Sequence, residues 1–408
     1  MSNKVPQIRF NGYSDDWVQR KLSEVTERVT RKNKNNESTR PLTISAQDGL
    51  IDQNDFFDKQ VASRDVSGYF LVKNGEFAYN KSYSNGYPWG AIKRLDHYDM
   101  GVLSTLYIVF KPTNVSSQFL VSYYDTTKWY KEVAKNAAEG ARNHGLLNIA
   151  PSDFFSTVLE IPTSIEEQDK IGDFLKKMDN LIAANQRKLD LLKEQKKGYL
   201  QKMFPKNGEK VPELRFAGSA DDWEQCKLSD EMTDFIVPMR DKPKEFGGNI
   251  PWTRIEDIEG KFLNDSLSEQ YVTEETIQKM NLKIIPKDSL IVSSSATFGV
   301  VAVVTQDLIT NQTFIGLVPR EKNTLDYWYA FFQSSEARKY MKLQSAGSTI
   351  FYIARDSFEK MPISVPKIDE MIKIGEYFSN LDNLIALHQR KLELLKEQKN
   401  GFLQKMFV

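Results

Sequence analysis

Residues 186–196 have the sequence QRKLDLLKEQK, and residues 389–399 repeat it as QRKLELLKEQK. The match extends over residues 171–204 and 374–407, in which 23 of 34 aligned residues are identical at an offset of 203. Apolar residues recur every seven positions through both copies, which is the spacing of a coiled coil. At about 1.5 Å per residue, a helix of this length would be about 50 Å long.

A second pair of segments recurs in the same order. Residues 5–25 and 211–231 share 12 of 21 residues at an offset of 206, including VPxxRF and DDW. Two matched blocks at nearly one offset indicate an internal duplication, so the chain consists of two units of about half its length.

The repeated helices predict a seam of apolar side chains interrupted by polar ones. Asn185 and His388 hold equivalent seam positions, as do Lys196 and Lys399, and such residues lower stability but fix register. We therefore predict that the two helices pair antiparallel about a pseudo-twofold axis; the alternative is a long amphipathic helix lying on one domain. The predicted seam residues are Leu175, Met178, Ile182, Asn185, Leu189 and Leu192 in the first copy and Phe378, Leu381, Ile385, His388, Leu392 and Leu395 in the second.

Between the repeated blocks lie two long stretches that are not visibly alike except at their exits. β-type runs such as residues 105–110 and 300–304 alternate with helical patterns such as residues 326–343. The predicted fold class is α+β, with two insert domains separated by two long helices in an antiparallel coiled coil. The predicted boundaries are 1–25 and 211–231 for the two scaffold segments, 26–162 and 232–366 for the inserts, 163–210 for the central helix and linker, and 367–408 for the C-terminal helix.

Composition limits the class of protein. The 408 residues are 40% hydrophobic and 27% charged, and no run approaches the roughly 18 apolar residues of a membrane span. The N-terminus lacks the apolar core of a secretory signal. The single cysteine, Cys226, excludes an internal disulfide, and with three scattered histidines it gives no zinc-ligand pattern. We expect a cytoplasmic protein that binds no membrane.

The charge balance does not point to a binding partner. Lys and Arg number 55, as do Asp and Glu. A DNA-binding surface would therefore have to arise from the segregation of charge in the fold.

The order VPxLRF, DDW, variable domain and QRKLxLLKEQKxGxLQKMF resembles the specificity subunit of type I restriction–modification systems. The resemblance covers essentially the whole chain. Within the inserts, residues 250–258 and 288–295 are similar to the opening and middle of a target recognition domain, and residues 72–80 are similar to that middle element. One departure is visible: residues 166–168, Glu-Glu-Gln, resemble the helix start of the family, whereas residues 369–371 are Asp-Glu-Met.

The resemblance implies a non-catalytic subunit that recognises double-stranded DNA. Each target recognition domain would bind one half of a bipartite, asymmetric site, and the paired helices would set the spacer. Two modification subunits would dock on the repeated regions and methylate adenine with S-adenosylmethionine. Restriction subunits would add ATP- and Mg-dependent translocation and cleavage. No cofactor or metal is expected on this chain.

The chemistry that the sequence lacks agrees with this hypothesis. It has no Asn/Asp-Pro-Pro-Tyr/Phe motif for a flipped adenine and no Gly-x-x-x-x-Gly-Lys loop for a nucleotide phosphate. A self-contained methyltransferase or nuclease is therefore disfavoured. The alternative from another class is a duplicated coiled-coil adaptor that does not bind DNA. The salt dependence of DNA affinity would separate the two.

Candidate DNA contacts come from loops that mix cations, amides and hydroxyls, because phosphates attract Lys and Arg while base edges need bidentate polar groups. Ordinary solvated turns are the alternative for each loop. The candidates in the first insert are Lys81, Tyr83, Ser84, Asn85, Lys93, Arg94, Arg142, Asn143 and His144. Those in the second are Arg254, Ser293, Ser294, Ser295, Thr297, Asn311, Gln312, Ser345, Ser348 and Thr349.

Overall fold

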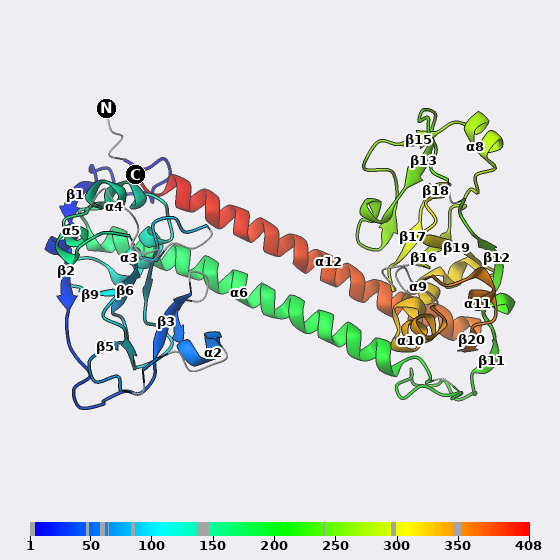
Figure 1. Cartoon of the computed structure of the whole chain (residues 1–408), viewed down its shortest axis with the longest axis horizontal. Coiled ribbons are helices and arrows are strands. Elements are labelled where there is room, and N and C mark those ends of the chain that lie inside the picture. The colour runs from blue at the N-terminus through cyan, green and yellow to red at the C-terminus, as the bar shows by residue number, and fades with distance from the viewer. Residues whose placement is uncertain are drawn as a thin grey trace. The chain divides into compact units, whose positions relative to one another are not determined.

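The structure is a computed structural model. It describes residues 5–45, 49–57, 62–63, 65–82, 86–137, 147–206, 208–239, 241–294, 299–345 and 352–408. The chain divides into two compact units, one made of Met1–Ala184 with Leu392–Val408 and the other of Asn185–Lys391. Two 38-residue helices, α6 (Ile165–Lys202) and α12 (Ile368–Lys405), contribute to both (Figure 1). Each unit therefore contains the N-terminal part of one long helix and the C-terminal part of the other.

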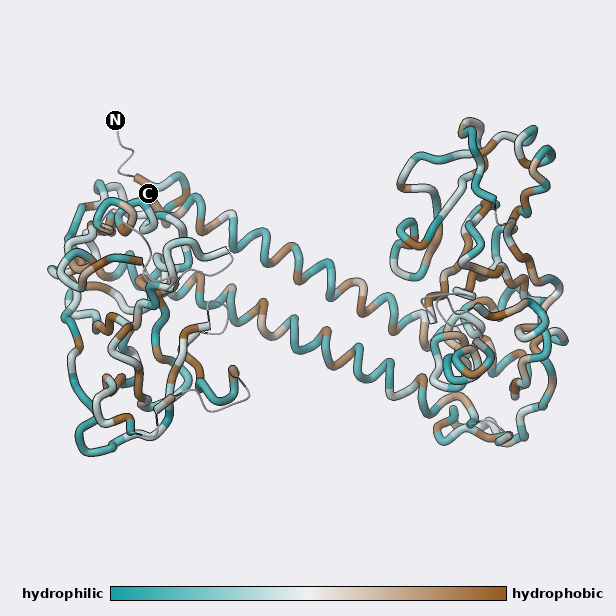
Figure 2. The backbone as a smooth tube through the Cα atoms, viewed as in Figure 1, coloured by the Kyte–Doolittle hydropathy of each residue, from teal (hydrophilic) through white to brown (hydrophobic). Residues whose placement is uncertain are grey.

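Within each unit the two long helices run antiparallel. In the first unit the rings of Phe174 and Phe402 lie 4.9 Å apart. In the second unit the rings of Tyr199 and Tyr377 lie 5.3 Å apart. The duplication makes these two pairs equivalent, so the predicted pseudo-twofold pairing of the helices is confirmed. Figure 2 shows hydrophobic and hydrophilic residues alternating along both helices, as a one-sided seam requires.

Both long helices begin shortly after a proline. Pro162 and Pro366 precede α6 and α12, where the missing N–H of proline is not needed. The Ser164 hydroxyl accepts a hydrogen bond from the Glu167 amide (3.4 Å), and acidic residues occupy the first turn of each helix.

The scaffold segments fold into equivalent two-stranded antiparallel sheets, one in each unit. The Leu22 amide donates to the Thr157 carbonyl, and the Leu228 amide to the Met361 carbonyl, each at 2.9 Å. These bonds place the end of each insert beside its beginning. The strands are β1 (Val18–Lys21) with β10 (Val158–Ile161) and β11 (Glu224–Lys227) with β20 (Pro362–Val365); the short helices beside them are α1 (Leu22–Val25), α5 (Pro151–Phe155), α7 (Leu228–Glu231) and α11 (Arg355–Glu359).

The first insert is built on an antiparallel sheet of order β2-β9-β6-β7. Its strands are β2 (Thr26–Val29), β9 (Ile108–Pro112), β6 (Phe77–Asn80) and β7 (Ala91–Arg94). Two smaller sheets pair β3 (Leu42–Ser45) with β4 (Gly49–Asp52) and β5 (Phe70–Lys73) with β8 (Met100–Leu103). The helices are α2 (Gln53–Phe57), α3 (Ser117–Tyr124) and α4 (Tyr130–Asn136).

The second insert contains a sheet of order β12-β19-β16-β17-β14 and a smaller one of order β15-β13-β18. The main strands are β12 (Met232–Ile236), β19 (Phe314–Pro319), β16 (Ser289–Ser293), β17 (Val301–Val304) and β14 (Phe262–Leu263). The smaller sheet has β15 (Tyr271–Val272), β13 (Ile250–Thr253) and β18 (Ile309–Thr310). The helical elements are η1 (Ile255–Asp257), α8 (Glu274–Met280), η2 (Lys322–Thr324), α9 (Leu325–Gln333) and α10 (Ser335–Gln344).

The two inserts share a core that their sequences do not reveal. The order β2-β9-β6-β7 corresponds to β12-β19-β16-β17. In each insert the strand of these four that comes last in the chain, β9 or β19, is followed by a helix, α3 or α9. A sheet needs only side chains that fit a half-buried pleated surface, so unlike sequences can adopt it. The helical pattern over 326–343 is divided in the structure, because Ser334 has extended backbone and its hydroxyl accepts from the Ala337 amide (3.3 Å), which caps α10.

Each long helix approaches its insert closely at a glycine. A Cβ atom on Gly172 would lie 2.7 Å from the backbone carbonyl carbon of Gln118 in α3. A Cβ on Gly375, the duplicate of Gly172, would lie 2.7 Å from the backbone nitrogen of Tyr327 in α9. Contacts this short are possible only without a side chain, so the two glycines allow equivalent helix-to-helix packing in the two units.

Candidate nucleic-acid interface and paired-helix scaffold

The predicted seam positions face inward. In the first unit Leu175, Met178 and Leu392 are buried, and Ile182 and Leu395 are half-buried. The second unit buries Asn185, Leu189, Leu192, Phe378 and Leu381, with Ile385 and His388 half-buried.

Asn185 and His388 contact each other. The Asn185 Nδ2 donates to the His388 backbone carbonyl (2.8 Å), and the His388 Nδ1 lies 2.7 Å from the Asn185 Oδ1. Because an amide oxygen only accepts, the histidine Nδ1 must carry the proton. The contact therefore joins the two copies of one duplicated seam position.

The two seam lysines make equivalent bridges, one in each unit. Lys196 Nζ lies 2.5 Å from Asp382 Oδ1 and 2.7 Å from Gln333 Oε1. Lys399 Nζ lies 2.6 Å from Asp179 Oδ1 and 3.3 Å from Asp125 Oδ2. Gln333 ends α9 and Asp125 directly follows α3. Each lysine therefore connects its own helix to the opposite helix and to the insert, so the register of the helix pair is coupled to the position of the insert.

Asp125 has two cationic partners. Lys93 Nζ lies 2.8 Å from its Oδ1, and Lys399 is the second cation. Burial opposes ionisation of the carboxyl group, but the two lysines outweigh burial, so the pKa of Asp125 lies below its usual value. Burial likewise disfavours the charged form of Lys399, yet Asp125 and Asp179 raise its pKa.

The arginine of each VPxxRF motif holds the start of a long helix. Arg9 donates from Nε and Nη2 to Glu167 at 2.6 and 2.9 Å, and Arg215 donates to Glu370 at 2.7 Å through both nitrogens. Such forked pairs are geometrically specific. Glu167 and Glu370 are equivalent, so the difference between Gln168 and Met371 leaves the joint intact in both units.

Of the candidate DNA contacts of the first insert, some lie outside the described residues and the others bind neighbouring groups of the chain. Tyr83, Ser84, Asn85, Arg142, Asn143 and His144 lie outside the described residues. Lys81 is half-buried, its ammonium donates to the Ile149 carbonyl (3.4 Å), and burial lowers its pKa. Lys93 binds Asp125. Arg94 donates to Asp96 (2.6 Å), the Ser117 hydroxyl (2.9 Å) and Gln118 (2.9 Å), so it joins β7 to α3.

In the second insert Ser295, Thr297, Ser348 and Thr349 also lie outside the described residues. Ser293 and Ser294 are buried, and the Ser294 amide donates to the Thr313 carbonyl (2.9 Å). The Asn311 Oδ1 accepts from the Thr313 amide (3.2 Å), and the Ser345 hydroxyl donates to the Lys342 carbonyl (2.6 Å). Gln312 is exposed. Arg254 is half-buried and makes a different set of contacts, described below.

Residues 221–397 match the type I restriction modification DNA specificity domain. The match includes the second scaffold segment from Asp221, the second insert and most of α12.

Curated specificity subunits from archaea and bacteria are similar to parts of the chain. The type I restriction enzyme MjaIX specificity subunit of Methanocaldococcus jannaschii is 28% identical over 179 residues, 43% of this chain and 41% of that protein. The EcoR124I/EcoR124II specificity subunit of Escherichia coli is 30% identical over 141 residues, 34% of each chain. The matched region therefore spans less than half the length of either relative.

A solved structure shares the fold over nearly the full length. The type I restriction–modification S subunit from M. genitalium superposes with a TM-score of 0.59 at 14% identity, and the match covers 99% of both chains. The fold of two inserts on two long helices is therefore that of a specificity subunit.

The long helices also expose leucines outside the seam. In the first unit Leu181 is 56% and Leu394 is 41% exposed. Their duplicates in the second unit, Leu384 and Leu191, are 45% and 66% exposed. The heptad grid puts all four on the same flank of their helices, outside the seam. The two units therefore expose equivalent apolar side chains.

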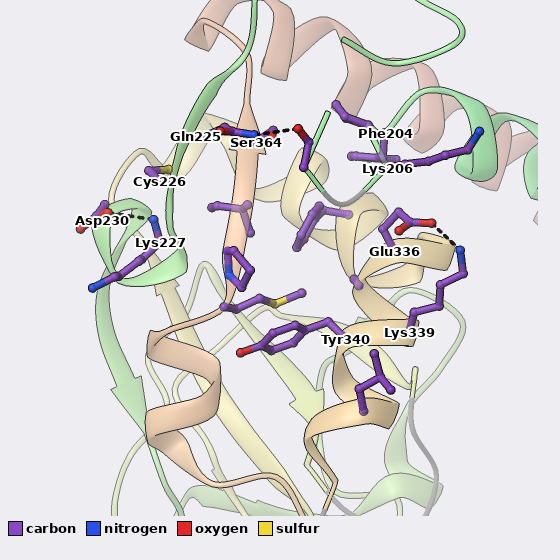
Figure 3. Close-up of a pocket in the computed structure, with 18 residues that line it drawn as sticks. Phe204, Lys206, Gln225, Cys226, Lys227, Asp230, Glu336, Lys339, Tyr340 and Ser364 are labelled. Carbon is purple, nitrogen blue, oxygen red and sulfur yellow. Dashed lines mark hydrogen bonds and ion pairs between the residues drawn. The ribbon is translucent and has the colours of Figure 1, made fainter. Parts of the chain in front are cut away.

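A groove of about 700 Å³ lies in the second unit between α10, the β11–β20 sheet and the segment after α6 (Figure 3). Cys226 lines it, and burial raises the pKa of this thiol to about 12, so the thiol stays protonated at neutral pH and is a poor nucleophile. The corresponding depression in the first unit, beside Gln19 and Val408, measures only about 70 Å³.

Two absences apply to the part of the chain that the structure describes. No group of three or more His, Cys, Asp or Glu side chains is placed to hold a metal ion. Among the same residues, no helix has the length and apolar character that crossing a membrane requires.

Proposed function

We propose that the chain is the DNA-recognition subunit of a type I restriction–modification complex. Each insert recognises one half of a bipartite, asymmetric site, and the paired helices set the spacer between the halves. The main support for this proposal is the pair of lysine bridges, because Lys196 and Lys399 join the helix pair to the two inserts by equivalent contacts. Two unlike recognition surfaces on two equivalent supports suit an asymmetric two-part DNA site.

The partners are two copies of one modification subunit, together with restriction subunits. The duplicated exposed leucines support the number two, since equivalent surfaces bind equivalent partners. S-adenosylmethionine, ATP and Mg are held by those subunits, and this chain is not an enzyme. Because its formal net charge is zero, the chain alone attracts DNA weakly and the assembled complex supplies the remaining phosphate contacts. The complex works in the cytoplasm.

Mapping of methylated adenine tests the proposal. The chain is produced with its modification subunit in a host that lacks adenine methylation, and the genome is sequenced for N6-methyladenine. We expect one motif of two parts separated by unspecified bases. Exchange of residues 26–162 for the insert of a relative should change one half of the motif only. A host without the chain is the control, and a single continuous motif would contradict the assignment of one insert to each half.

Salt dependence separates this function from that of an adaptor. The complex should lose orders of magnitude in DNA affinity between low and moderate salt, because bound phosphates release counterions. An adaptor would join its partners without binding DNA at any salt concentration.

A further inference from the structure

Three side chains share one face of the small sheet in the second insert. Strand β13 pairs with β15, and the Trp252 amide donates to the Gln270 carbonyl (2.8 Å), which sets Gln270 opposite Trp252. Arg254 continues the extended backbone of β13, with φ −136° and ψ −179°. Because side chains alternate along a strand, Trp252, Arg254 and Gln270 point to the same side of the sheet.

The Arg254 guanidinium is held in place but only partly bonded. Its central carbon lies 5.7 Å from the centre of the Trp252 ring, whose other cationic neighbour is Lys242, with Nζ at 5.2 Å. Nη2 donates to the Ser268 hydroxyl (3.1 Å). Nε is buried, and it has no hydrogen-bond partner among the residues that the structure describes. Its separation from Glu256 Oε2, 4.0 Å, is too long for a hydrogen bond.

Gln270 supplies the complementary atom. Its Oε1 is buried and, within the described part of the chain, accepts no hydrogen bond. A buried donor and a buried acceptor without partners both lower stability, so both are expected to gain partners in a complex.

The nearest buried carboxylate does not neutralise the guanidinium. Asp257 Oδ2 accepts from the Arg254 backbone amide (2.6 Å), and Oδ1 accepts from the Leu267 amide (2.8 Å). Asp257 thereby orders the segment before Gln270, and its oxygens are used by backbone groups. Apart from the loose ion pair with the exposed Glu256 at 4.0 Å, the arginine charge is available to a ligand.

We propose that Arg254 and Gln270 form a base-recognition site for a G·C pair in the half-site bound by the second insert. Arg254 donates to the O6 and N7 acceptors of guanine in the major groove, and Gln270 Oε1 accepts from the exocyclic amino group of the paired cytosine. The Trp252 ring holds the guanidinium plane. The site rests on the proposed function and identifies the base pair that this part of the second insert recognises.

The test uses the complex of the chain with its modification subunit, and compares wild type with Arg254→Lys and Gln270→Leu. Methylation is mapped in the genome and measured on duplexes in which each base pair of the second half is replaced in turn. We expect each variant to lose roughly 5- to 150-fold of its discrimination at the same single G·C position. The first half of the motif should stay unchanged. Arg355→Lys is the control, since Arg355 lies in the same insert and pairs with Glu359 (2.6 Å).

The outcomes distinguish failure of the proposed base-recognition site from failure of the proposed function. A wild-type chain that directs no two-part motif would contradict the proposed function. A wild-type motif that both variants leave unchanged would overturn the site alone. Where a variant abolishes methylation, specific and nonspecific DNA affinity are measured with the melting temperature. Loss of specific affinity with unchanged melting supports the site, whereas a lowered melting temperature or an equal loss of nonspecific affinity overturns it.

Discussion

Asn185 donates a hydrogen bond to the backbone of His388, its own counterpart in the duplicated sequence. The pair also joins Asn185 Oδ1 to His388 Nδ1 at 2.7 Å. A polar pair in an otherwise apolar seam fixes one alignment of the helices, because sliding by a heptad would leave both side chains facing leucine or methionine.

Removal of the pair should raise stability and loosen register. We expect Asn185→Leu with His388→Leu to raise the free energy of unfolding by about 1 kcal/mol, since apolar replacement of a buried polar pair is often stabilising. Asn185→Leu alone should instead lower it by about 1–3 kcal/mol, because His388 loses its partner. Thermal denaturation measures both. A double variant less stable than the single one would contradict this role.

Low pH should lower the stability of the first unit, because it protonates Asp125. Its pKa is lower in the folded chain than in the unfolded one. The stability it contributes is therefore complete above the usual aspartate pKa of about 4 and is lost as pH falls through the folded-state pKa. Asp125→Asn should cost about 2 kcal/mol at pH 7 and flatten the acid limb of the stability curve. Gln333→Leu, at the equivalent joint, should lower stability equally at all pH values, because the amide does not titrate.

The helical glycines should respond to alanine in opposite directions. Gly172→Ala and Gly375→Ala push a methyl group into insert backbone and should cost about 1–3 kcal/mol. Gly198→Ala and Gly401→Ala lie in the same helices with open space around them. They should gain about 0.5–1 kcal/mol from helix propensity. Urea denaturation of the four variants checks this, and equal effects would show that the close approach is absent.

The forked ion pairs should not tolerate lysine. Arg9→Lys and Arg215→Lys replace two parallel hydrogen bonds by one and should each cost about 1–2 kcal/mol. Arg20→Lys is the control, because Arg20 is exposed and lies 3.9 Å from Glu24. Its effect should stay within about 0.5 kcal/mol. Similar losses at all three positions would argue against a special role for the fork.

The number of bound modification subunits should depend on the exposed leucines of the long helices. We expect Leu181→Lys or Leu384→Lys to leave one modification subunit bound and the double variant to bind none. The neighbouring Asn180→Lys and Asn383→Lys are matched controls, because both asparagines are also exposed. Native mass spectrometry gives the count. Two subunits retained by the double variant would move the docking surface elsewhere.

The heptad spacing was sufficient to predict the long helices, because it is a local feature, and the duplication within one chain was sufficient to predict their antiparallel pairing. The common sheet order of the inserts was not predictable, since pairing such as β6 with β9 joins residues far apart in sequence. Lys93 and Arg94 were chosen as cations in a polar segment, but Asp125 and Gln118 bind them from a helix that only folding brings near. Gln270 was missed because a lone glutamine carries no signal until it is aligned with Trp252.

The glycine contacts bear on how one insert can be replaced by another. Gly172 and Gly375 meet the inserts mainly through backbone atoms, which every amino acid possesses. At this contact the long helix therefore requires a helix of the insert in a given place and little else about its residues. A replacement insert would still have to supply a partner for the seam lysine, as Asp125 and Gln333 do.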